Sequence, residues 1–184
     1  MGLSTLELAV LILAICVAIN LQLSIKLLAM LRALPQEAQV LPIGLPLPTT
    51  QGRLLADGAP LTLPLAERAA VLLFLSSKCP KCKEKLPLLT SLLPLAQEAG
   101  VDMLLPSLES AWRLRRFIGP ELAAHTLLLK KAAYKALNPM LQTPNYTFVG
   151  AEGEVEAVGM IGDEDWLAFQ AQLQEIGAGA ELAA

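Results

Sequence analysis

Two cysteines separated by two residues stand between an apolar run and a segment of helical periodicity. Residues 69–77, AAVLLFLSS, form a short uninterrupted apolar run that predicts a strand buried on both faces, as at the centre of an α/β sheet. After Cys79 and Cys82, leucines recur at close to helical spacing as far as Gly100, where a helix is expected to end. The pair is therefore predicted at a helix N-terminus, directly after a buried strand.

Metal binding, a structural disulfide and electron exchange are the three roles such a pair can have. A structural zinc site normally needs four Cys or His ligands, commonly as two separated pairs, whereas this chain has three cysteines and one histidine. Cys16 lies in a long apolar segment and is interpreted as an ordinary buried thiol. A disulfide that closes so small a loop removes little chain entropy. We therefore interpret the pair as a site of reversible thiol–disulfide exchange, with no metal.

The predicted position of Cys79 favours its ionised form. A sulfur at the start of a helix faces unpaired backbone N–H groups and the positive end of the helix dipole. Cys79 is thus the predicted nucleophile, and Cys82, partly shielded, is predicted to resolve the mixed disulfide. Pro80 restricts the backbone between them and lacks an N–H that would be unpaired anyway.

Three lysines, Lys78, Lys81 and Lys83, surround the cysteine pair in the sequence. Their positive charge is expected to lower the thiol pKa further. The alternative is that they form an ordinary solvated face of the helix.

Further elements follow in an order that is typical of a mixed α/β domain. Residues 35–64 are rich in Pro and Gly and predict a linker that leads into short strands or a hairpin. Ser107 is the expected N-cap of a helix over residues 107–118. The other predicted elements are strands at 101–106 and 125–129, a short helix at 130–138, a hairpin at 146–159 and an amphipathic helix at 163–176.

Near its N-terminus the chain carries a segment suited to lipid. Residues 8–25 contain no charged side chain, and eighteen residues of helix at roughly 1.5 Å each span about 27 Å, close to the thickness of a bilayer core. The composition agrees, because 54% of residues are hydrophobic and only 17% are charged. A cleaved signal peptide is the alternative, but no Lys or Arg precedes the apolar segment. We predict an uncleaved transmembrane helix that continues to Pro35.

The charges around this helix and the cysteine chemistry predict opposite orientations. Lys26 and Arg32 follow the apolar segment, so the positive-inside bias weakly places the domain in the cytoplasm. Stable disulfides in partner proteins form outside the cytoplasm. The net charge of -3 provides no basic stripe, so nucleic acid is not an expected partner.

Two segments carry a resemblance to a known family. The stretch AAVLLFLSSKCPKCKEKLP resembles the active-site segment of the thioredoxin-like superfamily, including Pro87, five residues after Cys82. QTPNYTFVGAEGEV is similar to the cis-proline segment and last hairpin of that family. With the N-terminal apolar helix and the LPIGLPLPTTQGRLL lead-in, the sequence is most similar to the membrane-anchored TlpA and ResA branch, and within it to the methylamine utilisation protein MauD.

The resemblance implies a thioredoxin-like α/β fold, with a central mixed sheet flanked by helices, and a set of site residues. Cys79 and Cys82 would be catalytic, while Pro80, Lys81, Thr143 and Pro144 would bind the substrate chain, with Pro144 in the cis form. No cofactor is implied beyond the redox-active disulfide of Cys79 and Cys82.

Three positions depart from the family pattern. Lys78 replaces the aromatic residue that commonly precedes the first cysteine. Leu73 stands where thioredoxins carry a buried acid that relays protons to the resolving cysteine, and Lys85 stands where the TlpA-like pattern usually has Glu. These changes favour a specialised partner and weakly favour disulfide formation or isomerisation over reduction.

The expected domains are a transmembrane anchor at 1–34, a linker and lead-in at 35–52, a thioredoxin-like domain at 53–178 and a tail at 179–184. Together the features predict a single-pass protein of the bacterial inner membrane with its domain in the periplasm. It would assist the maturation of a disulfide-bearing client, which the resemblance implies is an amine dehydrogenase, and would be reset by a membrane redox partner. The alternative is a non-catalytic assembly subunit of a membrane-bound respiratory or dehydrogenase complex.

For several other residues a structural role is the simpler interpretation. His125, the only histidine, is expected to be packed or capped beside a strand. Trp112 with Arg113, Arg115 and Arg116 is expected to form a charged helix face rather than a docking patch. Glu109 has no partner that the sequence reveals.

Overall fold

The computed structural model describes residues 5–33 and 40–183. It divides into two compact units, Met1–Ala38 and Gln39–Ala184. Pro35, which was expected to end the first helix, lies outside the described residues, as does the start of the predicted linker.

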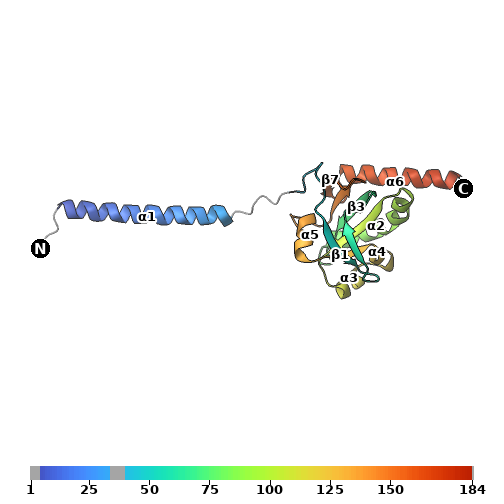
Figure 1. Cartoon of the computed structure of the whole chain (residues 1–184), viewed down its shortest axis with the longest axis horizontal. Coiled ribbons are helices and arrows are strands. Elements are labelled where there is room, and N and C mark those ends of the chain that lie inside the picture. The colour runs from blue at the N-terminus through green and yellow to red at the C-terminus, as the bar shows by residue number, and fades with distance from the viewer. Residues whose placement is uncertain (1–4, 34–39, 184) are drawn as a thin grey trace. The chain divides into compact units, whose positions relative to one another are not determined.

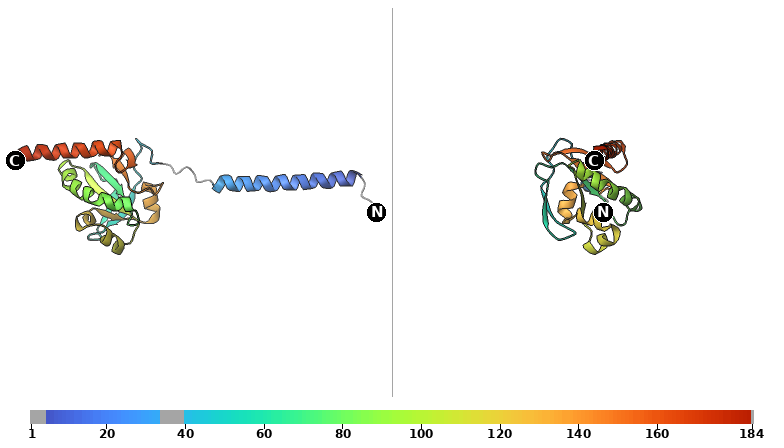
Figure 2. Two further views of the ribbon diagram at one scale, coloured as in Figure 1. Left: turned by 180° about the vertical axis from the view of Figure 1, so that it is seen from behind. Right: turned by 90° about the vertical axis from the view of Figure 1, so that its right-hand side faces the viewer.

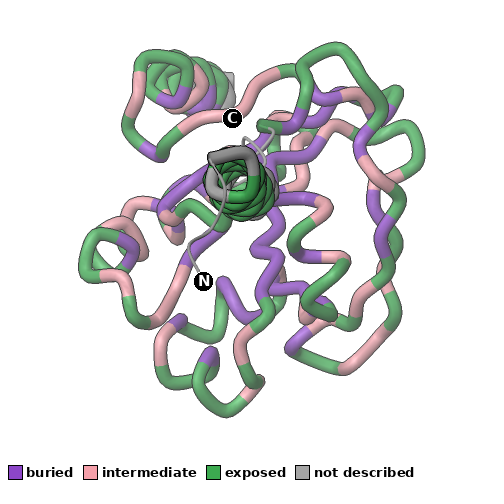
Figure 3. Tube along the Cα trace, turned by 90° about the vertical axis from the view of Figure 1, so that its left-hand side faces the viewer, coloured by how far each residue is buried: buried purple, intermediate pink, exposed green. Residues whose placement is uncertain are grey.

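The first unit contains one long helix, α1, at Thr5–Ala33. Within it, Ala9–Lys26 has a mean hydropathy of 2.1, and all of its residues are exposed (Figure 3). By length and composition, α1 is an apolar helix that could span a membrane.

The second unit is a mixed α/β domain, as the sequence predicts (Figure 1). Its sheet has seven strands. The sheet order is β2-β1-β5-β4-β3-β6-β7, with parallel pairing of β3 with β4 and of β4 with β5, and antiparallel pairing elsewhere. Its strands are β1 Thr50–Leu54, β2 Pro60–Leu63, β3 Ala70–Phe74, β4 Asp102–Ser107, β5 Thr126–Leu128, β6 Asn145–Val149 and β7 Val155–Met160. Its helices are α2 Pro80–Glu98, α3 Ala111–Phe117, α4 Pro120–Ala124, α5 Lys131–Leu137 and α6 Glu164–Ala183.

Strand β3 lies inside the sheet between β4 and β6, and all five of its residues are buried. Alternate side chains point to opposite faces of a strand, so β3 contributes to two hydrophobic cores. Leu73 belongs to the core that α2, α3, α4 and α6 cover, whereas Leu72 and Phe74 belong to the core covered by α5 and the lead-in segment. Helices α2 and α6 pack side by side over the first core (Figure 2).

The lead-in segment is part of the folded domain. Leu41 and Leu47 are buried in the second core, and the Leu47 N–H donates to the Gly153 carbonyl at 2.8 Å. Residues 41–47 therefore cover the α5 side of the sheet and contact the turn of the last hairpin.

Several predicted boundaries differ from those observed. Ser107 is the last residue of β4, because it pairs with Leu128 of β5, and the N-cap of α3 is Ser110. Helix α6 continues to Ala183 and so includes most of the expected tail at 179–184. The first half of α6 packs through the fully buried Trp166.

Trp166 packs against three aromatic rings and should contribute strongly to stability. Its ring lies 5.6 Å from Tyr146, 6.5 Å from Phe148 and 5.6 Å from Phe169, measured between centroids. Replacement by Ala in the full-length protein in detergent is expected to cost about 3–5 kcal/mol in chemical unfolding followed by circular dichroism. Trp112, which is 66% exposed, is the matched control, and its replacement by Ala should change the unfolding free energy by no more than about 0.5 kcal/mol. Equal losses at the two positions would contradict this description of the core.

Candidate active site

Cys79 is the N-cap of α2, and Pro80 is the first residue of the helix. The loop from the end of β3 leads directly into this position, and the Cys79 N–H donates to the Ser76 carbonyl at 3.0 Å. Both cysteines are free thiols. The sequence prediction that the pair lies between a buried strand and a helix N-terminus is confirmed.

The two thiols differ sharply in their surroundings. Cys79 is half-buried, while Cys82 is fully buried in the same core as Leu73. Pro80 and Lys81, the two residues between them, are exposed. An incoming chain can therefore contact Cys79 and the Pro80–Lys81 segment, whereas Cys82 lies behind them.

The Cys79 pKa is lowered from its ordinary value of 9.0. Burial alone would raise it, but hydrogen bonds from the Cys82 thiol, the Thr143 side chain and the N–H groups of Cys82 and Lys81 outweigh that effect. From the sequence we also expected the charges of Lys78, Lys81 and Lys83 to lower the Cys79 pKa. The side chains of these lysines are exposed, and the larger contributions to the lowered pKa come from the peptide groups at the helix start and the neighbouring Cys82 and Thr143 side chains.

The Cys82 pKa moves in the opposite direction. Burial among apolar side chains, with the hydrogen bond and charge of Cys79, raises the pKa of Cys82 to about 11. Leu73 belongs to the same core as Cys82, so this position supplies no carboxylate that could accept the Cys82 proton. The pair thus consists of one thiol that ionises readily and one that stays protonated.

The Thr143–Pro144 peptide bond is cis, as the resemblance implies, and it lies against the pair. The Cys79 thiol donates to the Thr143 carbonyl with a sulfur–oxygen distance of 3.7 Å. Thr143 is half-buried and Pro144 is buried. The structure therefore brings Cys79, Cys82, Pro80, Lys81, Thr143 and Pro144 together at one edge of the sheet. A second cis peptide bond, Leu63–Pro64, was not anticipated.

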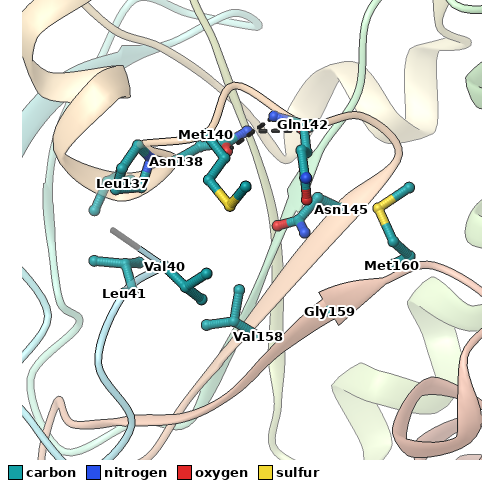
Figure 4. Close-up of a pocket in the computed structure, with 11 residues that line it drawn as sticks. Val40, Leu41, Leu137, Asn138, Met140, Gln142, Asn145, Val158, Gly159 and Met160 are labelled. Carbon is teal, nitrogen blue, oxygen red and sulfur yellow. Dashed lines mark hydrogen bonds between the residues drawn. The ribbon is translucent and has the colours of Figure 1, made fainter. Parts of the chain in front are cut away.

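The segment before the cis proline is held by a buried amide. The Asn138 side chain donates to the Gln142 carbonyl at 2.9 Å and accepts from the Gln142 N–H at 3.2 Å (Figure 4). Beside this segment, on the α5 side of the sheet, is a cavity of about 110 Å³ with Met140, Asn145 and Met160 in its lining. The cavity is separate from the thiols.

Glu109 is the contact that sequence reasoning missed. Its carboxylate accepts hydrogen bonds from Ser76 and Ser77, in the loop that leads to Cys79. A signal was present, because β3 and β4 are parallel neighbours and the loops after parallel strands meet at the same edge of a sheet. Among the described residues, no three His, Cys, Asp or Glu side chains gather in a way that could hold a metal ion.

Trp112, Arg115 and His125 were expected to have structural roles, and the structure shows contacts for each of them. The aromatic ring of Trp112 stacks with Arg116, whose guanidinium carbon lies 4.9 Å from the ring centroid. Arg115 instead donates to the Leu55 carbonyl at 2.5 Å and ties α3 to the end of β1. His125 is the C-cap of α4, in agreement with the capped role expected for it.

Comparison with known proteins shows the fold. No family description matches the sequence, and no curated protein matches it. Among solved structures, the thioredoxin domain of a thiol-disulfide oxidoreductase from Bacteroides vulgatus has a TM-score of 0.61 and 19% identity, over 73% of this chain and 99% of that one. A putative thiol:disulfide interchange protein DsbE from Chlorobium tepidum has a TM-score of 0.61 and 15% identity, over 74% of this chain and 99% of that one. A putative protein disulfide isomerase from Bacteroides thetaiotaomicron has a TM-score of 0.60 and 18% identity, over 75% of this chain and 89% of that one.

These neighbours are all described as thiol–disulfide proteins, and each superposes on the α/β unit at low sequence identity. The chain has a thioredoxin-like fold, with Cys79 and Cys82 at the start of its first domain helix.

Proposed function

We propose that the protein is a thiol–disulfide oxidoreductase in which Cys79 is the nucleophile and Cys82 the resolving thiol. The observation that carries this proposal is the unequal setting of the two sulfurs, since only the accessible one has a lowered pKa. A purely structural pair would have no need of an accessible, readily ionised member.

The exchange proceeds in two displacements. The Cys79 thiolate attacks one sulfur of a client disulfide, forms a mixed disulfide and releases the other client sulfur as a thiolate. Cys82 then loses its proton and attacks the Cys79 sulfur, which forms the Cys79–Cys82 disulfide and releases the second client thiol. Two electrons pass from this protein to the client, and the reverse sequence oxidises a client dithiol.

The surface around Cys79 is suited to an extended client segment. Thr143 and Pro144 form one side of the site, and the exposed Pro80 and Lys81 form the other. The Thr143 carbonyl, which accepts from the Cys79 thiol here, is released once that sulfur ionises. It then becomes available to accept from a backbone N–H of the client.

We further propose that the protein is anchored in the bacterial inner membrane by α1, with its domain in the periplasm. The apolar Ala9–Lys26 segment supports anchoring, and the need for an oxidising compartment supports the periplasmic side. The client would be a disulfide-bearing periplasmic enzyme. The resemblance of the lead-in and the Cys-Pro-x-Cys segment to MauD supports an amine dehydrogenase as that client, and a membrane redox partner would reset the pair.

Replacement of Cys82 by Ser should trap the client. Without the resolving sulfur, the mixed disulfide on Cys79 cannot be displaced from within and accumulates. Expression of Cys82→Ser in the native host is expected to give adducts that disappear on reduction, and mass spectrometry of these adducts would identify the client. Cys79→Ser is the control and should give no such adduct.

If Cys82→Ser forms no adduct and the wild-type pair does not equilibrate with glutathione, the oxidoreductase proposal is wrong. The non-catalytic assembly subunit would then be the better description. Adducts that contain no amine dehydrogenase subunit would remove that client and leave the chemistry intact.

The two thiols should react with an alkylating reagent in different pH ranges. A lowered pKa means that Cys79 becomes a thiolate at a pH below 9.0, whereas Cys82 stays protonated until about pH 11. In a Cys16→Ser background, iodoacetamide is expected to modify one thiol with a midpoint below pH 9.0 and the other only in strong alkali. Equal midpoints for the two thiols would contradict the assignment of roles.

The orientation of the domain can be read with fused reporters. Alkaline phosphatase fused after Ala184 is expected to be active, because it folds only outside the cytoplasm. A fluorescent protein that folds only in the cytoplasm is expected to be dark at the same position. The opposite pattern would place the domain in the cytoplasm, in agreement with Lys26 and Arg32.

A further inference from the structure

Glu109 lies two residues after the end of β4, at the edge of the sheet where the cysteine pair is placed. One carboxylate oxygen accepts from the Ser76 hydroxyl at 3.0 Å and from the Ser77 N–H at 2.9 Å, and the other accepts from the Ser77 hydroxyl at 2.5 Å. The Glu109 N–H donates to the Ser107 hydroxyl at 3.2 Å, so the acid is itself fixed to the end of β4. Three donors thus converge on one side chain.

The two serines that Glu109 binds connect β3 to the cysteine pair. The Ser76 carbonyl accepts from the Cys79 N–H at 3.0 Å, and the Ser76 hydroxyl accepts from the Lys78 N–H at 3.3 Å. The Ser76 backbone also acts on Cys82, because its hydrogen bond lowers the pKa of that thiol and partly offsets the effect of burial. One residue therefore contacts both cysteines, and Glu109 holds that residue from the opposite side.

We propose that Glu109 is a positioning residue for the dithiol, whose carboxylate holds the Ser76–Ser77 segment so that the Ser76 N–H stays directed at the Cys82 sulfur. This inference rests on the proposed function, because it concerns the step in which Cys82 resolves a mixed disulfide. A hydrogen bond from an N–H group to a sulfur favours the thiolate over the thiol. The contact would therefore assist the ionisation that the buried Cys82 otherwise resists.

Glu109 remains ionised in this role. Burial acts to raise its pKa, but the hydrogen bonds of Ser77 and Ser76 and the charge of Arg113 outweigh burial and lower it. Two further titratable groups face this region, Cys79 and Tyr134 of α5. The pKa of Tyr134 is raised by burial and by the charges of Cys82 and Glu109.

A positioning role and a simple charge effect predict opposite signs. A carboxylate that acted only through its negative charge would oppose thiolate formation, so its removal would make Cys82 easier to ionise. A carboxylate that acts by holding Ser76 assists thiolate formation, so its removal would make Cys82 harder to ionise. The sign of the change therefore decides between the two.

The test is rapid mixing of the reduced full-length protein, in a Cys16→Ser background, with a small chromogenic aromatic disulfide. The first release of chromophore reports attack by Cys79, and the second reports displacement by Cys82. In Glu109→Gln the second release is expected to slow by about three- to fourfold at neutral pH, which is what a rise of about one unit in the Cys82 pKa gives once the higher nucleophilicity of a more basic thiolate is counted. The first release should slow less than the second, because Ser76 binds the backbone N–H of Cys79 rather than its sulfur.

Glu84→Gln is the matched control, because it removes the same charge from an exposed residue two positions after Cys82. It is expected to leave the second release unchanged or slightly faster. Ser77→Ala, which removes one of the three donors, should give an intermediate rate. Combined with Glu109→Gln, it should slow the second release no further than Glu109→Gln alone.

A second release in Glu109→Gln that is unchanged or faster would overturn the inference. So would a fall in the chemical unfolding midpoint accompanied by equal slowing of both releases, because that pattern indicates general loss of structure. If the wild-type protein gives no second release, the proposed function itself fails. If the wild-type protein gives both releases and Glu109→Gln matches it, only the role of Glu109 fails.

Discussion

The placement of one sulfur at the start of α2 and the other in the core behind it is the constraint on which the site depends. Cys79 is the N-cap, where peptide N–H groups have no partner within the helix, and Cys82 is one turn further on, where α2 packs on the sheet. A single helix entrance thus gives two identical side chains different acidities. This difference in acidity depends on β3, which is buried on both faces and leads into the start of α2.

The site is held from two sides by polar side chains of unrelated segments. Glu109 binds the loop before Cys79, and Asn138 binds the segment that leads to Thr143 and Pro144. Each uses both of its terminal polar atoms, which fixes a loop in orientation as well as in position. The cysteine loop and the cis-proline loop therefore meet as two braced elements, and the geometry between Cys79 and the Thr143 carbonyl follows from these braces.

Local patterns predicted the strands and helices closest to the site, and long-range contacts explain what they could not predict. The apolar run before Cys79 and the leucine spacing after Cys82 were enough to place β3 and α2, whereas the cis form of Pro144 was implied by the family resemblance. Ser107 was misplaced, because its role depends on pairing with β5, about twenty residues away in the chain and not visible in local periodicity. Glu109 was missed for a similar reason, as its partners lie more than thirty residues earlier. For Lys78, Lys81 and Lys83 the sequence shows the charge, but it does not show that all three residues are exposed to solvent.

The contact between the lead-in segment and the last hairpin also bears on self-association. Strand β7 is an edge of the sheet, and open edges are templates on which other chains can pair. The Gly44 N–H donates to the Val155 carbonyl at 2.7 Å, and the Val155 N–H donates to the Leu45 carbonyl at 2.9 Å, so the beginning of β7 is already occupied. At the opposite edge, β2 begins with Pro60, which has no N–H to offer. This arrangement resists edge-to-edge aggregation without the need for a partner.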